Sequence, residues 1–321
     1  MAKIIVADGR DVTDGAMYNL LSQVDCGVDI LLISRHDGFV FNEEILTLKG
    51  KPYVIADVIE MGWDAKIDHT PFFGFDDSSF FSILRHPQFD NSKEQWLRLN
   101  DFIKGNQPIF YMKRELLAKD QDEMFIPLNY PAQYPIPEPQ SKEDFLKRPL
   151  DIFYSWGLSH PERRKLHGRI WLGSEEHGYM VCDNLFWIEL FMANENNAHK
   201  WLSVNIPHYC RFHSDQILNI NALAKISISM PGAGTCCFRH TEASANAIML
   251  MKDDKMAWSF PWLANDNCLK FERFGDEITT ALNGLNSPQL YDIYLRGVEN
   301  CKKYFLPNYI NHIEQKIKKV L

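Results

Sequence analysis

Residues 225–251 read KISISMPGAGTCCFRHTEASANAIMLM, and this stretch decides the fold. It opens on an apolar-alternating run at Lys225–Met230, passes Gly232 and Gly234, and closes on a second apolar run at Ile248–Met251. Apolar runs of this length, separated by a glycine loop and a helical segment, are typical of a strand–loop–helix–strand unit. The stretch therefore predicts α/β structure in the second half of the chain.

The same stretch predicts an anion-binding loop. Gly232 and Gly234 let the backbone approach a ligand, and a helix beginning near Phe238 would direct unpaired N–H groups and its positive dipole end at an anion. Glu242 lies one turn into that helix, where its carboxylate could accept hydrogen bonds from ribose hydroxyls. The alternative is a structural turn in which Glu242 stabilises the helix start and Arg239 is solvated. The pattern is neither a Walker A loop nor a G-x-G-x-x-G fingerprint.

The first half of the chain alternates short apolar runs with a helical pattern. A helix is predicted from Thr13 to about Gln23, where apolar residues recur at helical spacing. The predicted strands are Lys3–Ala7, Val28–Ser34, Pro52–Val58, Gln107–Met112 and Glu123–Leu128. Their near-continuous apolar character favours a parallel sheet with both faces covered.

Six prolines between Pro127 and Pro149 mark a boundary. Such a stretch cannot sustain a helix or a central strand, so it predicts an extended interdomain linker at 131–149. We expect an N-terminal α/β acceptor domain at 1–130 and a second α/β domain at 150–305. In that second part the sequence predicts a strand at Leu150–Gly157, helices from about Pro161 and at Asp215–Ala224, and a mostly helical C-terminus broken by Pro307.

Charge is unevenly divided between the two halves. Residues 1–149 carry 16 basic and 24 acidic side chains, whereas residues 150–321 carry 18 of each, so the whole net charge of −8 lies in the first half. An acidic half is a poor partner for a phosphate backbone, which disfavours nucleic acid as a ligand. The seven cysteines form no C-x-x-C pair, no apolar run is long enough for a membrane span, and we expect a cytoplasmic protein.

Residues 239–251, with Arg-x-x-Glu-Ala followed by small residues and an apolar strand, resemble the donor-binding segment of GT-B glycosyltransferases. In that superfamily the glutamate holds the ribose of a nucleotide sugar, which implies this role for Glu242. The segment from Ser155 through residues 160–164 resembles the opening of the same domain, where a small-residue turn and a basic helix start meet the donor diphosphate. A distant likeness to phage DNA glucosyltransferases is present in the same segments.

The resemblance implies a fold class and a function. The fold would be α/β, with two Rossmann-like domains facing a cleft and a C-terminal helix at 306–321 crossing back to the first domain. The function would be transfer of a sugar from a nucleotide-diphosphate sugar, such as a UDP-sugar, to a glycan or small-molecule acceptor. Two departures limit the likeness: Gly234 stands where the E-x7-E motif of retaining enzymes has its first glutamate, and no lysine pairs with Arg239.

Two arginines add to the expected donor site. Ser159 and Glu162 form a capping-box pattern, which places Arg163 and Arg164 in the opening turns of a helix, and guanidinium forks there suit a diphosphate. The alternative is a pair of ordinary exposed charges. The expected donor-binding residues are Ser155, Gly157, Arg163, Arg164, Gly232, Gly234, Thr235, Arg239 and Glu242.

Carboxylates at likely strand ends of the first half are candidates for the general base that an inverting transferase needs. Asp64 is the first choice, because a loop after the strand Pro52–Val58 would face the cleft, and Asp37 is the second. Each could equally be a solvated surface acid. We expect no metal, since His208, Cys210, His213 and His240 match no standard zinc spacing, and no resident cofactor.

These observations predict a glycosyltransferase that inverts the anomeric centre without a metal. Two alternatives stay open. One is a phage-type DNA glycosyltransferase acting on a flipped hydroxymethylated base, which the charge disfavours. The other is a non-catalytic protein of GT-B type that binds a nucleotide or a glycan.

Overall fold

The structure is a computed structural model of the 321-residue chain. It describes residues 3–9, 15–34, 39–58, 93–114, 116, 118–121, 123–155, 166, 170, 178–183, 214–230, 237–252, 256–271, 283–284 and 288–321.

The first half contains a five-stranded parallel sheet whose strands lie side by side in chain order. The strands are β1 (Ile4–Val6), β2 (Asp29–Ile33), β3 (Tyr53–Asp57), β4 (Phe110–Lys113) and β5 (Phe125–Pro127). Every residue of β3 and β4 is buried, as the unbroken apolar runs predict for strands covered on both faces. All five lie where the sequence predicted strands.

Among the residues that the structure describes, two helices flank this sheet, and the sequence predicted one of them. In α1 (Gly15–Ser22) the buried residues are Met17, Leu20 and Leu21, which share one helical face. The helix α3 (Lys93–Gly105) was not predicted, although Trp96, Leu99 and Ile103 recur at helical spacing and are buried. The short 3₁₀ helices are η1 (Glu43–Leu48) and η3 (Ala118–Asp120).

The second half contains another five-stranded parallel sheet, of different order. Its strands are β6 (Leu150–Tyr154), β7 (Val181–Asp183), β8 (Ala224–Ser229), β9 (Ile248–Lys252) and β10 (Leu269–Phe271), in the order β10-β9-β8-β6-β7. The strands β6, β8 and β9 follow the predicted runs, while β7 and β10 were not predicted. The helix α8 (Ser214–Asn221) packs on β8, and α9 (Arg239–Ser244) packs on β8 and β9.

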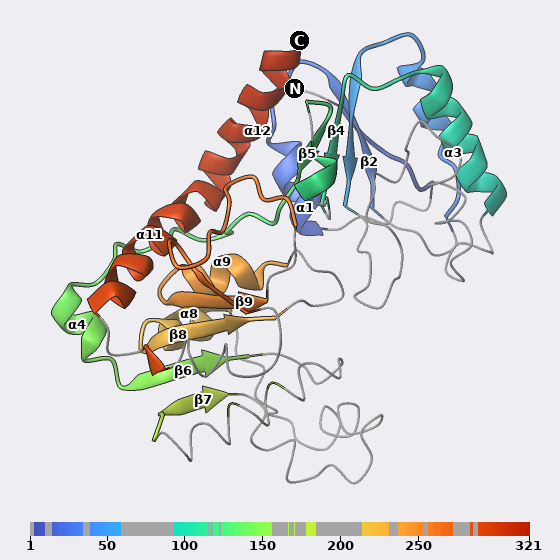
Figure 1. Cartoon of the computed structure of the whole chain (residues 1–321). Helices are drawn as coiled ribbons and strands as arrows, with labels where there is room; N and C mark the ends of the chain where they lie inside the picture. Colours follow the sequence, from blue (N-terminus) through green and yellow to red (C-terminus); the bar gives the residue numbers. More distant parts are fainter. Residues whose placement is uncertain are drawn as a thin grey trace, which may run out of the picture.

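Two consecutive helices form the C-terminus and connect the two halves (Figure 1). The first, α11 (Pro288–Tyr304), lies beside the second sheet, and α12 (Leu306–Val320) continues to the first half, where it packs on α1. The carboxylate of Glu314 accepts the backbone N–H of Asp25 at 2.7 Å. The helix therefore crosses back as predicted.

The residue that interrupts the C-terminal helices differs from the prediction. The break lies at Phe305, whose ψ of 132° is extended, and Pro307 belongs to the first turn of α12. A proline lacks the N–H that the first turn would leave unpaired, so it fits there and does not break the helix. Farther along α12, Ile313 and Ile317 are buried whereas the lysines are exposed, as expected for the outer face of a last helix.

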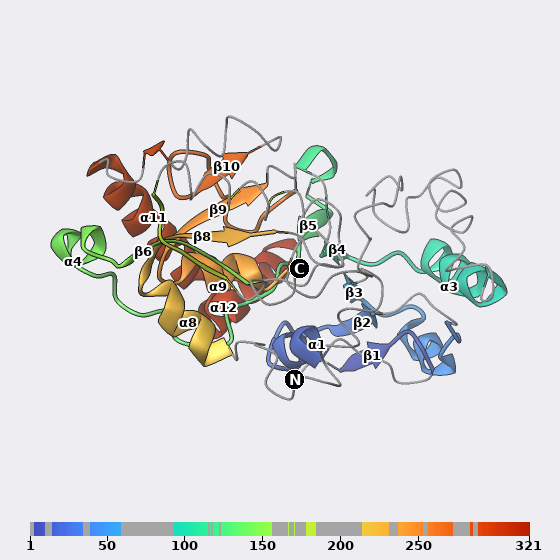
Figure 2. The same cartoon turned by 90° about the horizontal axis from the view of Figure 1, so that it is seen from below.

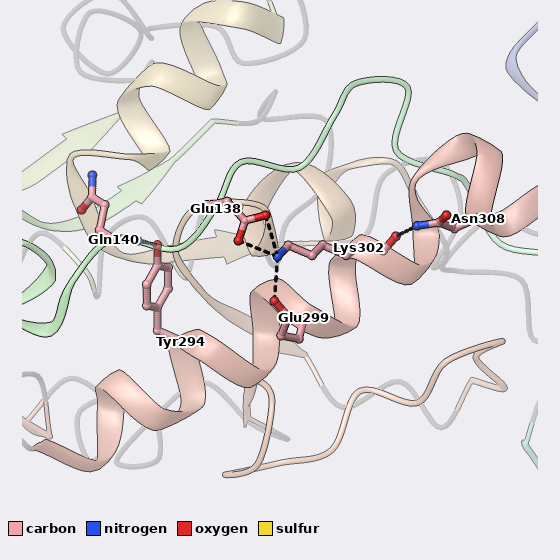
Figure 3. A network of polar contacts seen from close by, with 6 residues as sticks. All are labelled: Glu138, Gln140, Tyr294, Glu299, Lys302 and Asn308. Carbon is pink, nitrogen blue, oxygen red and sulfur yellow. Dashed lines mark hydrogen bonds and ion pairs between the residues drawn. The ribbon is translucent and has the colours of Figure 1, made fainter.

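The connection between the sheets runs along α11. It contains one short helix that the sequence did not predict, α4 (Lys142–Leu146), which lies in the proline-free interval before Pro149 and is capped by the Ser141 hydroxyl. Figure 3 shows how the connection is attached: Lys302 of α11 binds Glu138 at 3.0 Å, and the Tyr294 hydroxyl accepts the backbone N–H of Gln140 at 3.0 Å. Figure 2 shows the two sheets side by side, seen from below.

One hydrophobic core extends across both halves. It joins buried residues of the first sheet, such as Val54 and Met112, with Met249 and Met251 of β9 and with Tyr304 of α11. None of the helices in the ranges given above is long and apolar enough to cross a membrane.

A glycine in α11 is needed for this packing. A Cβ built on Gly297 would lie 2.8 Å from the backbone oxygen of Asn267, closer than real side chains approach a backbone atom. A Gly→Ala change inside a helix ordinarily raises the free energy of unfolding by about 1 kcal/mol. We expect Gly297→Ala instead to lower the free energy of unfolding by about 1–3 kcal/mol, because the helix must move away from the 263–267 loop.

Chemical denaturation of Gly297→Ala and of Gly105→Ala in parallel tests this. A Cβ on Gly105, at the end of α3, meets nothing within 4 Å, so this control should be neutral or stabilised. Equal stability of the Gly297 variant and the wild type would contradict the predicted clash.

Candidate functional site

The topology of the second sheet selects one edge for ligand binding. Counted within this sheet, the strand order is 2-1-3-4-5, so the chain moves outward in opposite directions from the boundary between β6 and β8. Ligands of open parallel sheets bind beyond the carboxyl ends of the strands at such a switch point. Ser155 follows β6 directly, and the 230–238 segment follows β8. The first sheet has its strands in simple chain order, so among the described strands it offers no switch point.

The structure brings two of the predicted donor residues together at this switch point. One guanidinium nitrogen of Arg239, the first residue of α9, donates to the backbone oxygen of Ser155 at the end of β6. Arg239 is partly exposed, and its guanidinium carries five N–H donors, so one contact fixes its position while others can reach a ligand. The arrangement places a cation at the switch point of the second sheet.

The helix α9 itself contributes less than the sequence suggested. It has six residues, and its N-cap Phe238 makes no side-chain capping bond. A helix of little more than one turn has a small macrodipole, so charge stabilisation at this edge depends on Arg239 more than on the helix end. Buried contacts hold the helix in place, among them the Asn221 amide, which donates to the Glu242 carbonyl at 2.7 Å.

Glu242 lies one turn after Arg239, and its side chain is nearly buried. The residue is 5% exposed, and its Oε2 has no hydrogen-bond partner among the described residues. Burial raises the pKa of Glu242 to about 7, although the charge of Arg239 lowers it. A buried carboxyl without a partner costs free energy, and such groups are frequent at functional sites. For the structural alternative, in which Glu242 stabilises the helix start, Oε2 contributes no hydrogen bond among the described residues.

A cysteine–histidine pair lies at the start of α9. The Cys237 thiol is 3.5 Å from Nδ1 of His240, which also lies 3.0 Å from the Cys237 carbonyl oxygen. Burial by itself raises the pKa of Cys237, but the neighbouring His240 and Arg239 outweigh it, so the pKa falls below its usual value. The ring of His240 packs on Trp258 at 4.8 Å. Within the described ranges no three potential metal ligands gather, and His208, Cys210 and His213 lie outside them.

Three residues near the site were missed by sequence reasoning. The ring of Phe238, 49% exposed, meets the edge of Tyr130 at 6.4 Å, and the guanidinium of Arg114 lies 4.3 Å above Tyr130. Tyr130 and Arg114 follow β5 and β4, so they bring the carboxyl edge of the first sheet to the start of α9. No local pattern marks them, because the contact between Tyr130 and Phe238 joins segments more than 100 residues apart.

Two acidic residues at strand ends of the first half, Asp57 and Asp8, are buried. Asp57 is fully buried, and its Oδ2 accepts from Lys113 Nζ at 2.8 Å and from the Tyr111 hydroxyl at 3.0 Å. Asp8 is also buried, at 2% exposure. Trp96 is a core residue, stacked on Phe39 with ring centroids 3.9 Å apart.

The remaining predicted site residues lie outside the described ranges, so their roles stay predictions. They are Asp37, Asp64, Gly157, Arg163, Arg164, Gly232, Gly234 and Thr235.

Comparisons with known proteins find a likeness in fold and none in sequence. No sequence-family profile matches the chain, and no curated protein matches it by sequence. Among solved structures, "Crystal structure of GtfA/B complex" matches with a TM-score of 0.50 at 10% identity, covering 94% of this chain and 59% of that one. "Crystal Structure of TarM" matches with a TM-score of 0.49 at 12% identity, covering 94% and 57%.

This chain thus spans less than two thirds of the length of those two proteins. A trehalose 6-phosphate synthase from Burkholderia multivorans matches with a TM-score of 0.49 at 10% identity, covering 95% of this chain and 75% of that one. Two parallel sheets, the C-terminal helix returning to the first half and the likeness to the GtfA/B structure together show that the chain has the GT-B-like fold its second half predicted.

Proposed function

We propose that this protein is a glycosyltransferase that moves a sugar from a nucleotide-diphosphate sugar to an acceptor hydroxyl, with inversion and without a metal. The observation that carries the proposal is the Arg239–Ser155 contact at the β6/β8 switch point, with the unpartnered carboxyl of Glu242 one turn farther on. The GT-B-like fold is compatible with it, but a fold alone does not define a function, and the site residues carry the argument.

The donor would lie across the carboxyl edge of the second sheet. Arg239 would pair with the diphosphate through its remaining N–H donors, and Glu242 would accept hydrogen bonds from the ribose hydroxyls. Arg163 and Arg164 would supplement the positive charge. A diphosphate held by arginines keeps its developing negative charge stabilised as the bond to the sugar breaks.

The first half would bind the acceptor and provide the general base. The acceptor oxygen attacks the anomeric carbon, the bond from that carbon to the diphosphate oxygen breaks, and the nucleoside diphosphate leaves. The acceptor proton passes to a carboxylate, for which Asp64 and then Asp37 are our candidates. The excess of acidic over basic side chains in the first half favours a neutral or cationic acceptor over DNA.

A thermal-shift and calorimetric panel of UDP, GDP, ADP and TDP, with their sugars, tests donor binding. We expect at least one nucleoside diphosphate to raise the melting temperature, and Arg239→Ala to weaken its binding about 10–100-fold through loss of charged hydrogen bonds. Arg239→Lys should restore only part of the affinity, because lysine has no fork for a diphosphate.

A matched control is Arg296→Ala on the exposed side of α11, where the arginine pairs with Asp266 at 2.9 Å. It should bind the nucleotide as the wild type does. If no nucleotide or nucleotide sugar stabilises the chain, the donor site is refuted. Release of free nucleoside diphosphate in the presence of an acceptor then separates a transferase from a silent binding protein.

A further inference from the structure

Phe238, the residue before α9, keeps about half of a large aromatic side chain in solvent. It is 49% exposed, whereas every other phenylalanine in the described ranges is buried or half-buried. The position is the N-cap of α9, where Ser, Thr, Asp or Asn would supply a capping bond, and Phe238 supplies none. Neither capping nor full burial therefore accounts for an aromatic ring at this position.

Contacts from both halves of the chain fix the orientation of this ring. The ring centroids of Phe238 and Tyr130 are 6.4 Å apart and the ring planes are nearly perpendicular, at 84°, which is a favourable aromatic arrangement. Tyr130 is held in turn by the buried guanidinium of Arg114, 4.3 Å from the centre of its ring. The guanidinium carbon of Arg239 lies 5.6 Å from the centre of the Phe238 ring, within the range of a cation–π contact. The exposed part of the ring is thus held in a defined place.

The location of Phe238 distinguishes it from an ordinary exposed apolar side chain. Single apolar residues are common on protein surfaces and by themselves need no explanation. Phe238, however, adjoins Arg239, which is bound to Ser155 at the switch point of the second sheet. Ligand sites combine a few polar groups with aromatic side chains that cover the apolar parts of the ligand. An aromatic ring beside this cation therefore fits a ligand that joins an anionic group to a ring with an apolar face.

The order of residues along α9 indicates which part of a nucleotide sugar the ring would meet. In the proposed function Glu242 binds the ribose and Arg239 binds the diphosphate, and in such a donor the diphosphate lies between the ribose and the sugar. The sugar must then lie on the other side of Arg239 from Glu242. Phe238 is on that side, about 6 Å from Glu242 along the helix axis. It also contacts the first half through Tyr130, where the acceptor would bind.

We propose that Phe238 stacks on the apolar C–H face of the sugar ring of the nucleotide-diphosphate sugar. The inference rests on the proposed function and deepens it, because it assigns a contact to the transferred sugar and not to the nucleotide. Phe238 would then determine how well the protein distinguishes a nucleotide sugar from the free nucleoside diphosphate. The ring acts through its aromatic face, so its effect is separable from that of charge.

Calorimetry with paired ligands tests this assignment. The pairs are UDP and UDP-glucose, GDP and GDP-mannose, ADP and ADP-glucose, and TDP and TDP-glucose. For the pair that binds, Phe238→Ala should weaken binding of the nucleotide sugar about tenfold and change binding of the nucleoside diphosphate less than about twofold. Phe238→Trp should keep the affinity for the nucleotide sugar. Phe238→Leu should restore only part of it, because leucine is apolar but has no aromatic face.

Leu223→Ala is the matched control. Leu223 is also 49% exposed, but it precedes β8 and so lies at the end of the strand opposite the candidate site. This variant should bind both members of the pair as the wild type does. Unchanged binding of the nucleoside diphosphate by Phe238→Ala also shows that the variant is folded and that its diphosphate site is intact.

The remaining outcomes separate this inference from the proposed function. Equal weakening of both ligands by Phe238→Ala would place the ring against the nucleotide and overturn the sugar assignment. Unchanged binding of both ligands would also overturn it, and a raised KM for the acceptor would then assign the ring to the acceptor. In each of these cases the donor site of the proposed function stands. If the wild type binds no nucleotide and no nucleotide sugar, the proposed function and the inference fail together.

Discussion

Asp57→Asn should lower the free energy of unfolding by about 3–5 kcal/mol, because it leaves a lysine charge buried without its counter-ion. Asp57 and Lys113 are register partners at the carboxyl ends of β3 and β4, and their side chains are 0% and 1% exposed. Their atoms Oδ2 and Nζ are 2.8 Å apart. Burial raises the pKa of Tyr111 well above its usual value, and the adjacent charge of Asp57 adds to the rise. The phenol therefore stays neutral and cannot replace the Asp57 carboxylate as the counter-ion of Lys113.

An exposed ion pair with nearly the same N–O distance provides the control. Arg98 and Glu43 of the same half are 2.7 Å apart but 44% and 65% exposed. Water solvates both charges when such a pair is broken, so Glu43→Gln should change stability by less than about 1 kcal/mol. Comparing the denaturant midpoints of Asp57→Asn and Glu43→Gln therefore shows the effect of burial for two ion pairs with similar N–O distances.

The double variant Asp57→Leu/Lys113→Met tests the cause. Replacing both charges by apolar groups removes the uncompensated charge, so the double variant should recover much of the stability that Asp57→Asn loses. If the double variant is as unstable as the sum of the single changes, the loss comes from packing and not from an orphaned charge. Equal midpoints for Asp57→Asn and Glu43→Gln would contradict the expected effect of burial.

Strands that are buried on both faces could be predicted from the sequence, because their signal is local. The unbroken apolar runs at Val28–Ser34 and Pro52–Val58 became β2 and β3. β7 and β10 were missed because their sequences, VCD and LKF, each contain a charged residue and form no unbroken apolar run, unlike IIV of the equally short β1. The helix α3 carried a clear helical spacing at Trp96, Leu99 and Ile103, and that signal could have been used.

The residues of the candidate site likewise fall into those that the local sequence marks and those that only the tertiary fold brings together. Arg239 and Glu242 were expected near each other because a helix fixes the spacing of residues three apart, and Ser155 was expected from the resemblance of its segment to the opening of a donor domain. Phe238, Tyr130 and Arg114 could not be predicted, since their contacts depend on which segments the tertiary fold brings together. The sequence also could not show that Glu242 would be buried, which follows from the packing of α9 between β8, β9 and α11.

Arg148→Met should also cost about 3–5 kcal/mol, because this side chain satisfies four separate buried or half-buried acceptors before β6 begins. Its guanidinium donates to the backbone oxygens of Ala224 and Asn246, at 2.6 Å and 2.5 Å. It also donates to the Gln140 side chain at 2.9 Å and the Tyr294 hydroxyl at 3.2 Å. Burial lowers the pKa of Arg148, but an arginine remains protonated in proteins.

These contacts join the inter-sheet connection, the starts of β8 and β9, and α11 at the edge of the second sheet opposite the candidate site. The guanidinium also stacks on the rings of Phe145 and Tyr294, at 4.7 and 4.8 Å. Arg148→Lys should therefore be nearly as harmful as Arg148→Met, since an ammonium keeps the charge but can neither reach four acceptors as a planar fork nor stack.

The adjacent residue isolates the effect. Lys147 pairs with Glu143 at 2.5 Å, but both side chains are more than 70% exposed, so Lys147→Met should leave the denaturation midpoint nearly unchanged. A Lys variant of Arg148 with wild-type stability would show that charge alone holds this edge together.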